Sequence, residues 1–506
     1  MVRAANPVGV EELEFALTGE VQALAIHTLF SEEGPRTPER GFIGILGSGT
    51  GLRRRRLFLR RIVPQDPGWV YWDRKGLGFS HRYFSRALDL ISTEPGGSGL
   101  IVVHSHPGSS SDVWTSPQPS SPDLEHERDL LWHQSRALPG AAPVAAGIVG
   151  PSGGWRVREY SWKRPRTPAE AASRRFGPRS GVHHDASVVS VVGPGRTDLH
   201  FATSAGRPAS AAKEVESSVL IWGQEGQERL GRLRVGIVGL GGVGSILAEF
   251  APRLGVGELV LVDYDTVKLE NRNRAVGASR RDLGRAKVLY CARVAKSAAV
   301  ASRFKVLAVI GSVQEESGIR PLLDCDVILN ACDDPAGRQV LDHVAYAHMI
   351  PVIDGGTTLF VDDGNGRVIG RSQVSGAAPG APCLECTGVY TREEASMARE
   401  RPEMRGPNAY LRRLDGGFDS DLPRAPSVIS SNGLVASLML MRLQRIVLGF
   451  PPRERVAQQS YYVEQGELLW GNAVESCKPD CYKPSLAGLG DAHRLPTGVD
   501  LNRNRS

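Results

Sequence analysis

The stretch LRVGIVGLGGVG at residues 233–244 decides the fold class of the C-terminal half of this chain. Its first six residues have the apolar pattern of a buried strand, and Ser245–Arg253 after the glycines reads as a helix. A second strand, Leu259–Val262, follows and ends at Asp263. Strand, glycine turn, helix and strand in this order predict an α/β domain with a doubly wound, mostly parallel Rossmann-like sheet.

The glycine turn indicates a nucleotide site. Glycines allow the backbone to approach a phosphate, and the helix N-terminus offers N–H groups to anionic oxygens. An acid at the end of the second strand, here Asp263, can accept hydrogen bonds from ribose hydroxyls. The pattern alone is typical of a nicotinamide dehydrogenase. The candidate nucleotide-binding glycines are Gly239, Gly241, Gly242 and Gly244.

The residues beyond the turn favour adenylation over hydride transfer. Asn271, Arg274 and Lys287 place an amide and two cations near the expected phosphates, where a hydride-transfer site needs a nicotinamide pocket. Asp265 is a further candidate for contact with the nucleotide. Attack of a carboxylate on an α-phosphate builds negative charge that cations and Mg²⁺ must hold. Asp333 comes just after an apolar strand, where a Mg²⁺ ligand would lie. We therefore expect ATP and Mg²⁺ as cofactors.

These motifs, together with the segment PSVISSNGLVA at 426–436, resemble the ThiF/MoeB family, which includes the ubiquitin-activating enzymes. The resemblance implies that Asp263 binds the ribose and that Asp333 holds Mg²⁺. It implies that Asn271, Arg274 and Lys287 bind phosphates, with Arg274 and Asp333 acting in catalysis. The implied substrate is the C-terminal glycine of a small ubiquitin-like or sulfur-carrier protein, and the implied assembly is a homodimer.

Two departures from the family pattern bear on the chemistry. The family carries an arginine a few residues before the position of Trp222, and this chain has none there. Arg207 is a candidate replacement, or the site is self-contained. Ubiquitin-type activating enzymes also carry a nucleophilic cysteine beyond the Mg²⁺ aspartate, but Thr387–Ile429 contains no cysteine. The sequence therefore gives no support for a thioester step on that segment.

Four of the seven cysteines form two close pairs, which is a metal-binding pattern. Four thiolates suit a structural, tetrahedral zinc site, and the resemblance implies one as well. The alternative is that Cys383 or Cys386 accepts the activated acyl group. The remaining cysteines, Cys291, Cys325 and Cys332, are expected as small buried apolar residues. The predicted zinc ligands are Cys383, Cys386, Cys477 and Cys481.

A different chemistry is indicated near the N-terminus. The strand Gly99–Val103 ends in His104-Ser-His106-Pro, and alternate strand residues face the same side, so the two imidazoles converge. Ser120-Ser-Pro-Asp123 then opens a helix. Two histidines and one carboxylate, with a position left for water, match a catalytic zinc site.

This set resembles the JAMM (Mov34/MPN) metalloprotease family, which cleaves peptide or isopeptide bonds after ubiquitin-like proteins. The resemblance implies His104, His106 and Asp123 as Zn²⁺ ligands and Ser120 as an oxyanion stabiliser. It implies Glu39 as the general base that takes a proton from water acidified by the metal. The segment between His106 and Ser120 is longer than the family's usual one, which keeps Asp112 open as a rival ligand.

Length and composition bound the organisation. The 506 residues, 41% hydrophobic and 23% charged, indicate several soluble globular domains. We expect a JAMM-like domain at 1–160, a linker with a short strand at 161–213, an adenylation domain at 214–483 and a tail at 484–506. The net charge of +6 does not demand nucleic acid, and no apolar run reaches the roughly 18 residues of a membrane helix. Paired metal-binding cysteines favour the cytoplasm.

The basic run Arg53–Arg56, with Arg60 and Arg61, has two interpretations: solvent-facing charges on a strand, or a docking patch for an acidic ubiquitin-like protein. Either way the run is expected at the surface.

The two halves together predict a bifunctional enzyme. It would adenylate the C-terminal glycine of a ubiquitin-like protein and cleave peptide or isopeptide bonds after it, with a conjugating-enzyme-like protein as a candidate partner. The alternative is sulfur transfer, in which adenylation feeds a thiocarboxylate on a carrier that the protease trims. A nicotinamide oxidoreductase and a non-catalytic scaffold are further alternatives.

Overall fold

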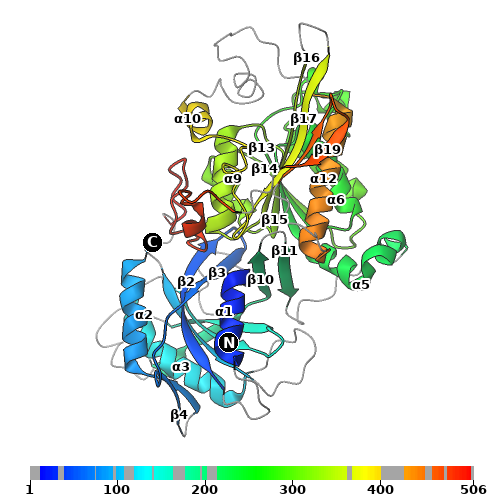
Figure 1. The fold of residues 1–506 in the computed structure, drawn as a ribbon. Helices are drawn as coiled ribbons and strands as arrows, with labels where there is room; N and C mark the ends of the chain where they lie inside the picture. Colours follow the sequence, from blue (N-terminus) through cyan, green and yellow to red (C-terminus); the bar gives the residue numbers. More distant parts are fainter. Residues whose placement is uncertain are drawn as a thin grey trace.

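The computed structural model shows two lobes joined end to end (Figure 1). The N-terminal lobe lies within residues 12–201 and the C-terminal lobe within 213–502. No helix among the residues that the structure describes is long and apolar enough to cross a membrane. The described residues are 12–31, 39–73, 76–94, 98–106, 119–139, 142–162, 177–193, 196–201, 213–361, 367–400, 427–450, 458–471 and 476–502.

The N-terminal lobe is built on a mixed sheet of nine strands in the order β11-β10-β1-β3-β2-β6-β7-β8-β9. Helix α1 packs on one face, and α2 and α3 pack on the other. The strands are β1 (Glu12–Thr18), β2 (Gly41–Thr50), β3 (Arg54–Ile62), β6 (Gly99–Ser105), β7 (Val144–Val149), β8 (Trp155–Ser161), β9 (Val182–Asp185), β10 (Val188–Gly193) and β11 (Arg196–Phe201). The other elements are α1 (Gly19–Phe30), α2 (His81–Thr93), α3 (Ser121–Ser135), η1 (Pro178–Ser180) and the hairpin β4 (Val70–Asp73) and β5 (Gly76–Phe79).

The C-terminal lobe is built on an eight-stranded sheet in the order β14-β13-β12-β15-β16-β17-β18-β19. The strands from β14 to β16 pair in parallel, and β17, β18 and β19 extend the sheet antiparallel. The strands are β12 (Arg234–Val238), β13 (Glu258–Asp263), β14 (Lys305–Ile310), β15 (Val327–Asn330), β16 (Val352–Val361), β17 (Val368–Ala377), β18 (Gln458–Tyr462) and β19 (Glu467–Trp470).

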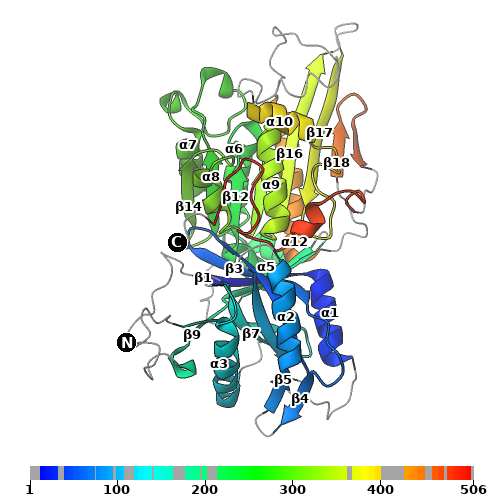
Figure 2. The same ribbon diagram turned by 90° about the vertical axis from the view of Figure 1, so that its left-hand side faces the viewer.

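Helices cover both faces of this second sheet (Figure 2), so the predicted doubly wound, mostly parallel α/β fold is confirmed for the C-terminal lobe. One face packs against α5, α6, α7 and α12, and the other against α8, α9 and α10. The helices are α5 (Glu216–Arg232), α6 (Gly242–Arg253), α7 (Lys287–Ala298), α8 (Glu316–Leu322), α9 (Pro335–Ala347), α10 (Arg392–Glu400), α12 (Ile429–Leu448) and the short η2 (Leu269–Asn271), η3 (Arg280–Asp282) and η5 (Lys483–Leu486).

Two segments that were expected outside the domains are built into the lobes: the linker belongs to the N-terminal lobe and the tail to the C-terminal lobe. The expected linker, 161–213, supplies three strands, β9, β10 and β11, to the N-terminal sheet, because the apolar face of β10 pairs in parallel with β1. The tail packs as well: Leu486, Leu489, Leu495 and Leu501 are buried in the core beside α8 and α9. The burial of these four leucine side chains stabilises the tail against the lobe, although polar residues lie between them.

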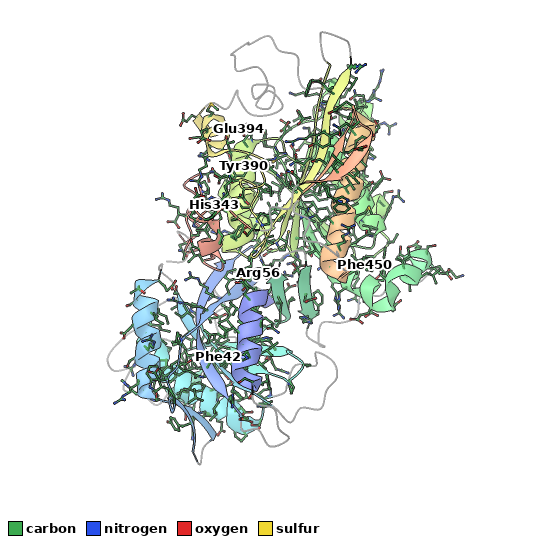
Figure 3. The ribbon with its side chains drawn as sticks, in the orientation of Figure 1. Phe42, Arg56, His343, Tyr390, Glu394 and Phe450 are labelled. Carbon is green, nitrogen blue, oxygen red and sulfur yellow. The ribbon has the colours of Figure 1, made fainter. Side chains whose placement is uncertain are left out.

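Arg54 and Arg56 of the basic run lie buried at the junction between the lobes, so the interpretations that placed them at the surface are wrong, whereas Arg61 is half-exposed as a surface charge would be. Arg54 donates to Glu14 at 2.9 Å and to Asp326 of the other lobe at 2.5 Å. Arg56, labelled between the lobes in Figure 3, donates to Glu14 at 2.6 Å and to the carbonyl of Cys325 at 3.1 Å. These side chains are buried, and their charges are matched by buried carboxylates, as a buried arginine requires.

The junction meets one end of each sheet. In the N-terminal lobe it includes the Thr50 end of β2, whose residue Ser48 bridges to Gly490 of the tail. In the C-terminal lobe, Asp326 lies just before β15, at the amino ends of the parallel strands. The opposite end of β2, at Gly41, is about 30 Å away at roughly 3.3 Å per residue. Any site at Gly41, or at the carboxyl ends of the parallel strands, therefore faces away from the junction.

Candidate functional site

A pocket of about 480 Å³ opens at the carboxyl ends of β12, β13 and β15. This is the end at which open parallel sheets bind their ligands. We call it the nucleotide pocket. Every candidate nucleotide residue except Gly244 lines it: Gly239, Gly241, Gly242, Asp263, Asp265, Asn271, Arg274, Lys287 and Asp333.

The glycines of the turn have distinct roles. A side chain on Gly244 would meet the carbonyl oxygen of Gly239 at 1.8 Å, so this glycine permits the helix α6 to pack against the turn. Gly239 itself has φ +79°, in the left-handed region that favours glycine. A side chain on Gly241 would meet nothing within 4 Å. That open space is where an anion can approach the start of α6.

Asp263 holds the turn in place. Its Oδ2 accepts a hydrogen bond from the backbone N–H of Leu240 at 2.6 Å, and its Oδ1 accepts one from Asp265 at 2.7 Å. Burial raises the pKa of Asp263, although Lys287 opposes this shift. Each carboxylate oxygen has a further lone pair, so the side chain can still accept a hydrogen bond from a hydroxyl group.

Lys287, Arg274 and Asn271 each contact a neighbouring protein group beside the pocket. Lys287 Nζ lies 2.9 Å from Asp265 Oδ2. Arg274 donates to the carbonyl of Glu270 at 2.7 Å, and Asn271 accepts from the backbone of Lys268 at 2.9 Å. Both cations line the pocket, where they can be drawn to phosphate oxygens.

The adjacent acids Asp333 and Asp334 differ in their contacts. Asp334 caps α9 by accepting from the N–H groups of Ala336 at 3.2 Å and Gly337 at 3.1 Å, and it also accepts from Gln314 at 2.6 Å. Asp333 is exposed to the pocket. The surrounding protein desolvates Asp333 and raises its pKa, against the effect of the neighbouring Arg338. Asp333 is thus the better placed of the two to hold a cation.

Further polar residues line the same pocket: Arg338 and Asp354, which were not predicted from the sequence, and Asn432, which was predicted only as part of the 426–436 motif and given no role. Arg338 on α9 donates to Asp354 at 3.0 Å, and Asn330 donates to the same oxygen at 2.6 Å. Asn432, at the start of α12, contacts Ser427 at 3.1 Å. A signal was available for Arg338, because it follows Asp333 by five residues on the first turn of α9. Asp354 lies in an apolar strand and gave no such signal.

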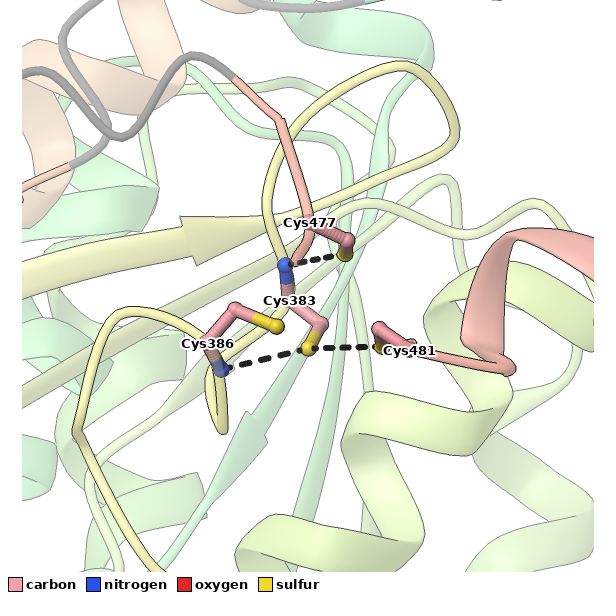
Figure 4. Close-up of side chains that lie close together, drawn as sticks. All are labelled: Cys383, Cys386, Cys477 and Cys481. Carbon is pink, nitrogen blue, oxygen red and sulfur yellow. Dashed lines mark hydrogen bonds between the residues drawn. The ribbon is translucent and has the colours of Figure 1, made fainter. Parts of the chain in front are cut away.

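The two cysteine pairs converge, although they are almost a hundred residues apart in sequence (Figure 4). We call Cys383, Cys386, Cys477 and Cys481 the cysteine cluster. Their sulfur atoms all lie within 4.8 Å of one another, and Cys383 Sγ is 3.8 Å from Cys481 Sγ. Zinc–sulfur bonds of about 2.3 Å in a tetrahedron give a sulfur–sulfur separation of roughly 3.8 Å. The cluster can therefore bind zinc.

Backbone N–H groups support the sulfurs of the cluster. Cys386 donates to Cys383 Sγ at 3.3 Å, Cys383 to Cys477 Sγ at 3.2 Å, and Lys478 to Cys386 Sγ at 3.4 Å. Such donors stabilise thiolates, which are the form that binds a metal. Of the three other cysteines, Cys291 and Cys325 are buried as expected, but Cys332 is partly exposed and lines the nucleotide pocket.

In the N-terminal lobe, His104, His106 and Asp123 form what we call the histidine site. Their ligand atoms lie within 4.8 Å of one another. The Nε2 atoms of the two histidines are 3.2 Å apart, and His106 Nε2 is 3.6 Å from Asp123 Oδ2. Zinc–nitrogen bonds of about 2.0–2.1 Å in a tetrahedron separate the nitrogens by roughly 3.3 Å. The three residues fit one metal ion.

The surroundings of the histidine site affect its charges. Burial, and then His106, lower the pKa of His104 to about 3, so this imidazole is neutral and able to be a ligand. Burial raises the pKa of Glu39, with Asp123 acting in the same direction and His106 against it. Burial also raises the pKa of Asp123, but hydrogen bonds from Ser120 outweigh it and bring the pKa below its ordinary value.

Ser120 and Asp123 form a capping box at the start of α3. The backbone N–H of Ser120 donates to Asp123 Oδ2 at 2.6 Å, and that of Asp123 donates to Ser120 Oγ at 3.2 Å. The S-x-x-D motif therefore has a structural role in addition to any chemical one. Two further candidates, Asp112 as a rival ligand and Arg207 as the replacement arginine, lie outside the described residues.

The sequence model of the family described as "ThiF family" matches residues 215–482. The chain is 29% identical over 173 residues to a "Molybdopterin-synthase adenylyltransferase" of Escherichia coli, covering 34% of this chain and 65% of that protein. It is 31% identical over 169 residues to a "SAMP-activating enzyme E1" of Haloferax volcanii, covering 32% of this chain and 56% of that protein.

A "Sulfur carrier protein adenylyltransferase" of Thermus thermophilus is 29% identical over 164 residues, which is 32% of this chain and 58% of that protein. The chain thus spans less than two thirds of the length of each of these three relatives. All three are named for the activation or adenylation of a substrate.

Proposed function

The chain belongs to the ThiF family, and from this premise we propose that its C-terminal lobe adenylates the C-terminal glycine of a small ubiquitin-like or sulfur-carrier protein with ATP and Mg²⁺. The observation that carries the proposal is the nucleotide pocket, where an open glycine turn, two cations and an exposed acid lie together. The sulfur-carrier reading has the better support, because relatives are named for sulfur-carrier and molybdopterin-synthase adenylation.

In this proposal each side chain has one task. The open space at Gly241 and the N-terminus of α6 accept the phosphates, and Asp263 accepts from the ribose. Lys287 exchanges Asp265 for the phosphate oxygens, and Arg274 faces the charge that develops as the carboxylate attacks the α-phosphate. Asp333 would hold Mg²⁺, which when bound neutralises pyrophosphate charge. Gly244 supports the turn by packing.

The cysteine cluster is proposed to hold a structural zinc ion. Its four sulfurs fill a tetrahedral set, so no position is left for a substrate. In this account Cys383 and Cys386 are ligands, and neither accepts the acyl group. The ion would fix the segment after β17 to the segment that precedes the tail, adding to the contact of Lys483 with Glu385 and of Arg392 with the Tyr482 ring.

ATP–pyrophosphate exchange tests the adenylation proposal. The protein is incubated with ATP, Mg²⁺ and labelled pyrophosphate in the presence of small carrier proteins that end in glycine. Exchange is expected with one carrier and is expected to be lost when the last glycine of that carrier is removed. Exchange without any carrier, or equal exchange with the shortened carrier, would contradict the proposal. The product then distinguishes the two readings: a thiocarboxylate on the carrier, or the carrier joined to another protein.

A second activity is proposed for the N-terminal lobe on the geometry of the histidine site. His104, His106 and Asp123 would hold zinc, a Lewis acid that acidifies water and polarises a carbonyl group. Glu39, whose pKa is raised, would hold the proton removed from water and pass it to the leaving amine. Ser120 would donate its hydroxyl to the carbonyl oxygen. The bond cut would be the peptide or isopeptide bond after the carrier's C-terminal glycine.

Because the two sites face away from the junction, the two reactions would use separate binding surfaces. His104 pairs with Gly41, at the far end of β2, and the nucleotide pocket lies at the far end of the other sheet. A carrier trimmed at one site would have to dissociate before its activation at the other. Partner proteins beyond the carrier, among them a conjugating-enzyme-like protein and a second copy of the chain, belong to the proposal only.

A further inference from the structure

Helix α3, which carries Asp123, is held on the sheet by an unusual contact. Of its fifteen residues only Glu127 and Leu131 are buried. Leu131 contributes about 1.5–3 kcal/mol by burial, and the partly buried Leu130 packs against the same core, but apolar contacts have no direction and do not fix the rotation of a helix about its axis. Two polar side chains of α3 make directional contacts: His126 Nε2 lies 3.1 Å from the carbonyl oxygen of Leu77, and Glu127 makes the stronger, charged contact described next.

The carboxylate of Glu127 is bound by two residues of β8. Arg158 donates twice, from Nε to Oε2 at 3.2 Å and from Nη2 to Oε1 at 2.5 Å, and the Tyr160 hydroxyl donates to Oε2 at 2.8 Å. The Arg158 side chain is 0% exposed. Residues 158 and 160 face the same side of the strand. A two-pronged arginine–carboxylate pair has a defined plane, so it fixes orientation as well as distance.

Glu127 lies one helical turn after Asp123, on the same face of α3. A side-chain tip lies about 5–6 Å from a helix axis, so a rotation of roughly 10° displaces it by about 1 Å. Metal ligands tolerate only about 0.2 Å. The position of Asp123 Oδ2, 3.6 Å from His106 Nε2, therefore depends on how α3 is rotated.

We propose that Glu127, Arg158 and Tyr160 form a clamp that positions Asp123 as the third ligand of the histidine site. The inference rests on the proposed metal site of the N-terminal lobe. Arg158 is a positioning residue, because it acts through its contacts to Glu127 and contacts no reacting group in the proposal. A purely stabilising ion pair would affect the whole lobe, whereas the clamp acts selectively on the affinity for the metal.

Cobalt(II) binding to the full-length, metal-free protein tests the clamp. Cobalt at the cysteine cluster gives intense sulfur charge-transfer bands, and cobalt at a histidine–carboxylate site gives weaker bands in the visible range, so both sites are read in one titration. We expect Arg158→Lys, which keeps the charge but loses the fork, to weaken cobalt binding at the histidine site by about 10- to 100-fold. Binding at the cysteine cluster should not change.

The matched control is Arg156→Lys on the same strand, because Arg156 pairs with the exposed Asp185 at 3.2 Å. This variant should bind cobalt as the wild type does. Tyr160→Phe removes one donor and should give a smaller loss, which keeps the test decisive if Arg158→Lys does not fold.

Three results would overturn the clamp. The first is unchanged affinity at the histidine site in both Arg158→Lys and Tyr160→Phe. The second is an equal loss at both metal sites, which would show general destabilisation. The third is a wild-type protein that gives only the sulfur bands, which would also overturn the proposed metal site itself. The first two results leave that metal site standing, so the two failures are distinguishable.

Discussion

Asp333 and Asp334 are neighbouring acids, and replacing them one at a time should separate nucleotide binding from stability. The Asp333 carboxylate is exposed to the pocket, whereas Asp334 accepts three hydrogen bonds, two from the first turn of α9 and one from Gln314. We expect Asp333→Asn to weaken the binding of Mg²⁺–ATP without unfolding the protein. We expect Asp334→Ala to destabilise the protein and to have a small effect on binding.

The magnitudes follow from these contacts. In Asp333→Asn, Mg²⁺–ATP loses one charged contact, which should weaken the free energy of binding by about 2–3 kcal/mol. At about 1.4 kcal/mol per tenfold this is a roughly 30- to 150-fold loss of affinity. Because the protein around the pocket partly desolvates the Asp333 carboxylate and raises its pKa, its charged form is less favourable in the folded than in the unfolded chain. At neutral pH the neutral amide should therefore keep or raise the Tm. Removal of the Asp334 cap and its side-chain partner should cost about 1–3 kcal/mol.

Calorimetric titration with Mg²⁺–ATP measures the first quantity, and thermal unfolding without nucleotide measures the second. The reasoning is refuted if Asp333→Asn binds within about threefold of the wild type, which is less than 1 kcal/mol. It is equally refuted if Asp334→Ala keeps its Tm and loses as much affinity as Asp333→Asn. Either result would show that the two acids do not have the separate roles inferred from their contacts.

Three further predictions concern the rest of the chain. Arg54→Met should lower the free energy of unfolding by about 3–5 kcal/mol, because it removes the arginine that pairs with the buried Asp326 and leaves Glu14 with Arg56 alone. Arg61→Ala, at a half-exposed pair, should cost under about 1 kcal/mol in urea unfolding. Gly241→Ala should fold normally and lose ATP affinity in calorimetry, since only a phosphate would meet the new methyl group; an unchanged affinity would contradict this role. Cys383→Ser should lose zinc in elemental analysis and lower the Tm, and Cys291→Ser should keep its zinc.

The sequence predicted the C-terminal fold well because its signals are local. A buried strand, a glycine turn and a helix lie within one short stretch, and the strand-end acids follow from parallel topology. The nucleotide residues from Gly239 to Lys287 therefore converge in the structure as their order suggested. Asp354 was not foreseen, because its partner Arg338 comes from another element and only folding brings the two together.

The junction between the lobes was not predictable in the same way. Arg54 and Arg56 stand in an unbroken run of arginines, Arg53–Arg56, which is a pattern typical of a solvent-exposed surface. Their burial depends on Glu14 and Asp326, residues that lie far away in the sequence. The packing of the tail was not predicted for the same reason, since its leucines find their core only beside α9. Long-range pairing of charge and of apolar surface leaves little local trace.

The clearest test of the central claim is the intact mass of a glycine-terminated carrier protein after incubation with the wild-type chain, ATP and Mg²⁺. The account predicts a carrier heavier by one adenylyl group, formed only with ATP, and converted to a thiocarboxylate when a sulfur donor is supplied. It predicts that Asp333→Asn, folded and with its zinc retained, forms far less of this product. A carrier whose mass never changes although ATP is bound, or an adenylate formed equally by Asp333→Asn, would contradict it.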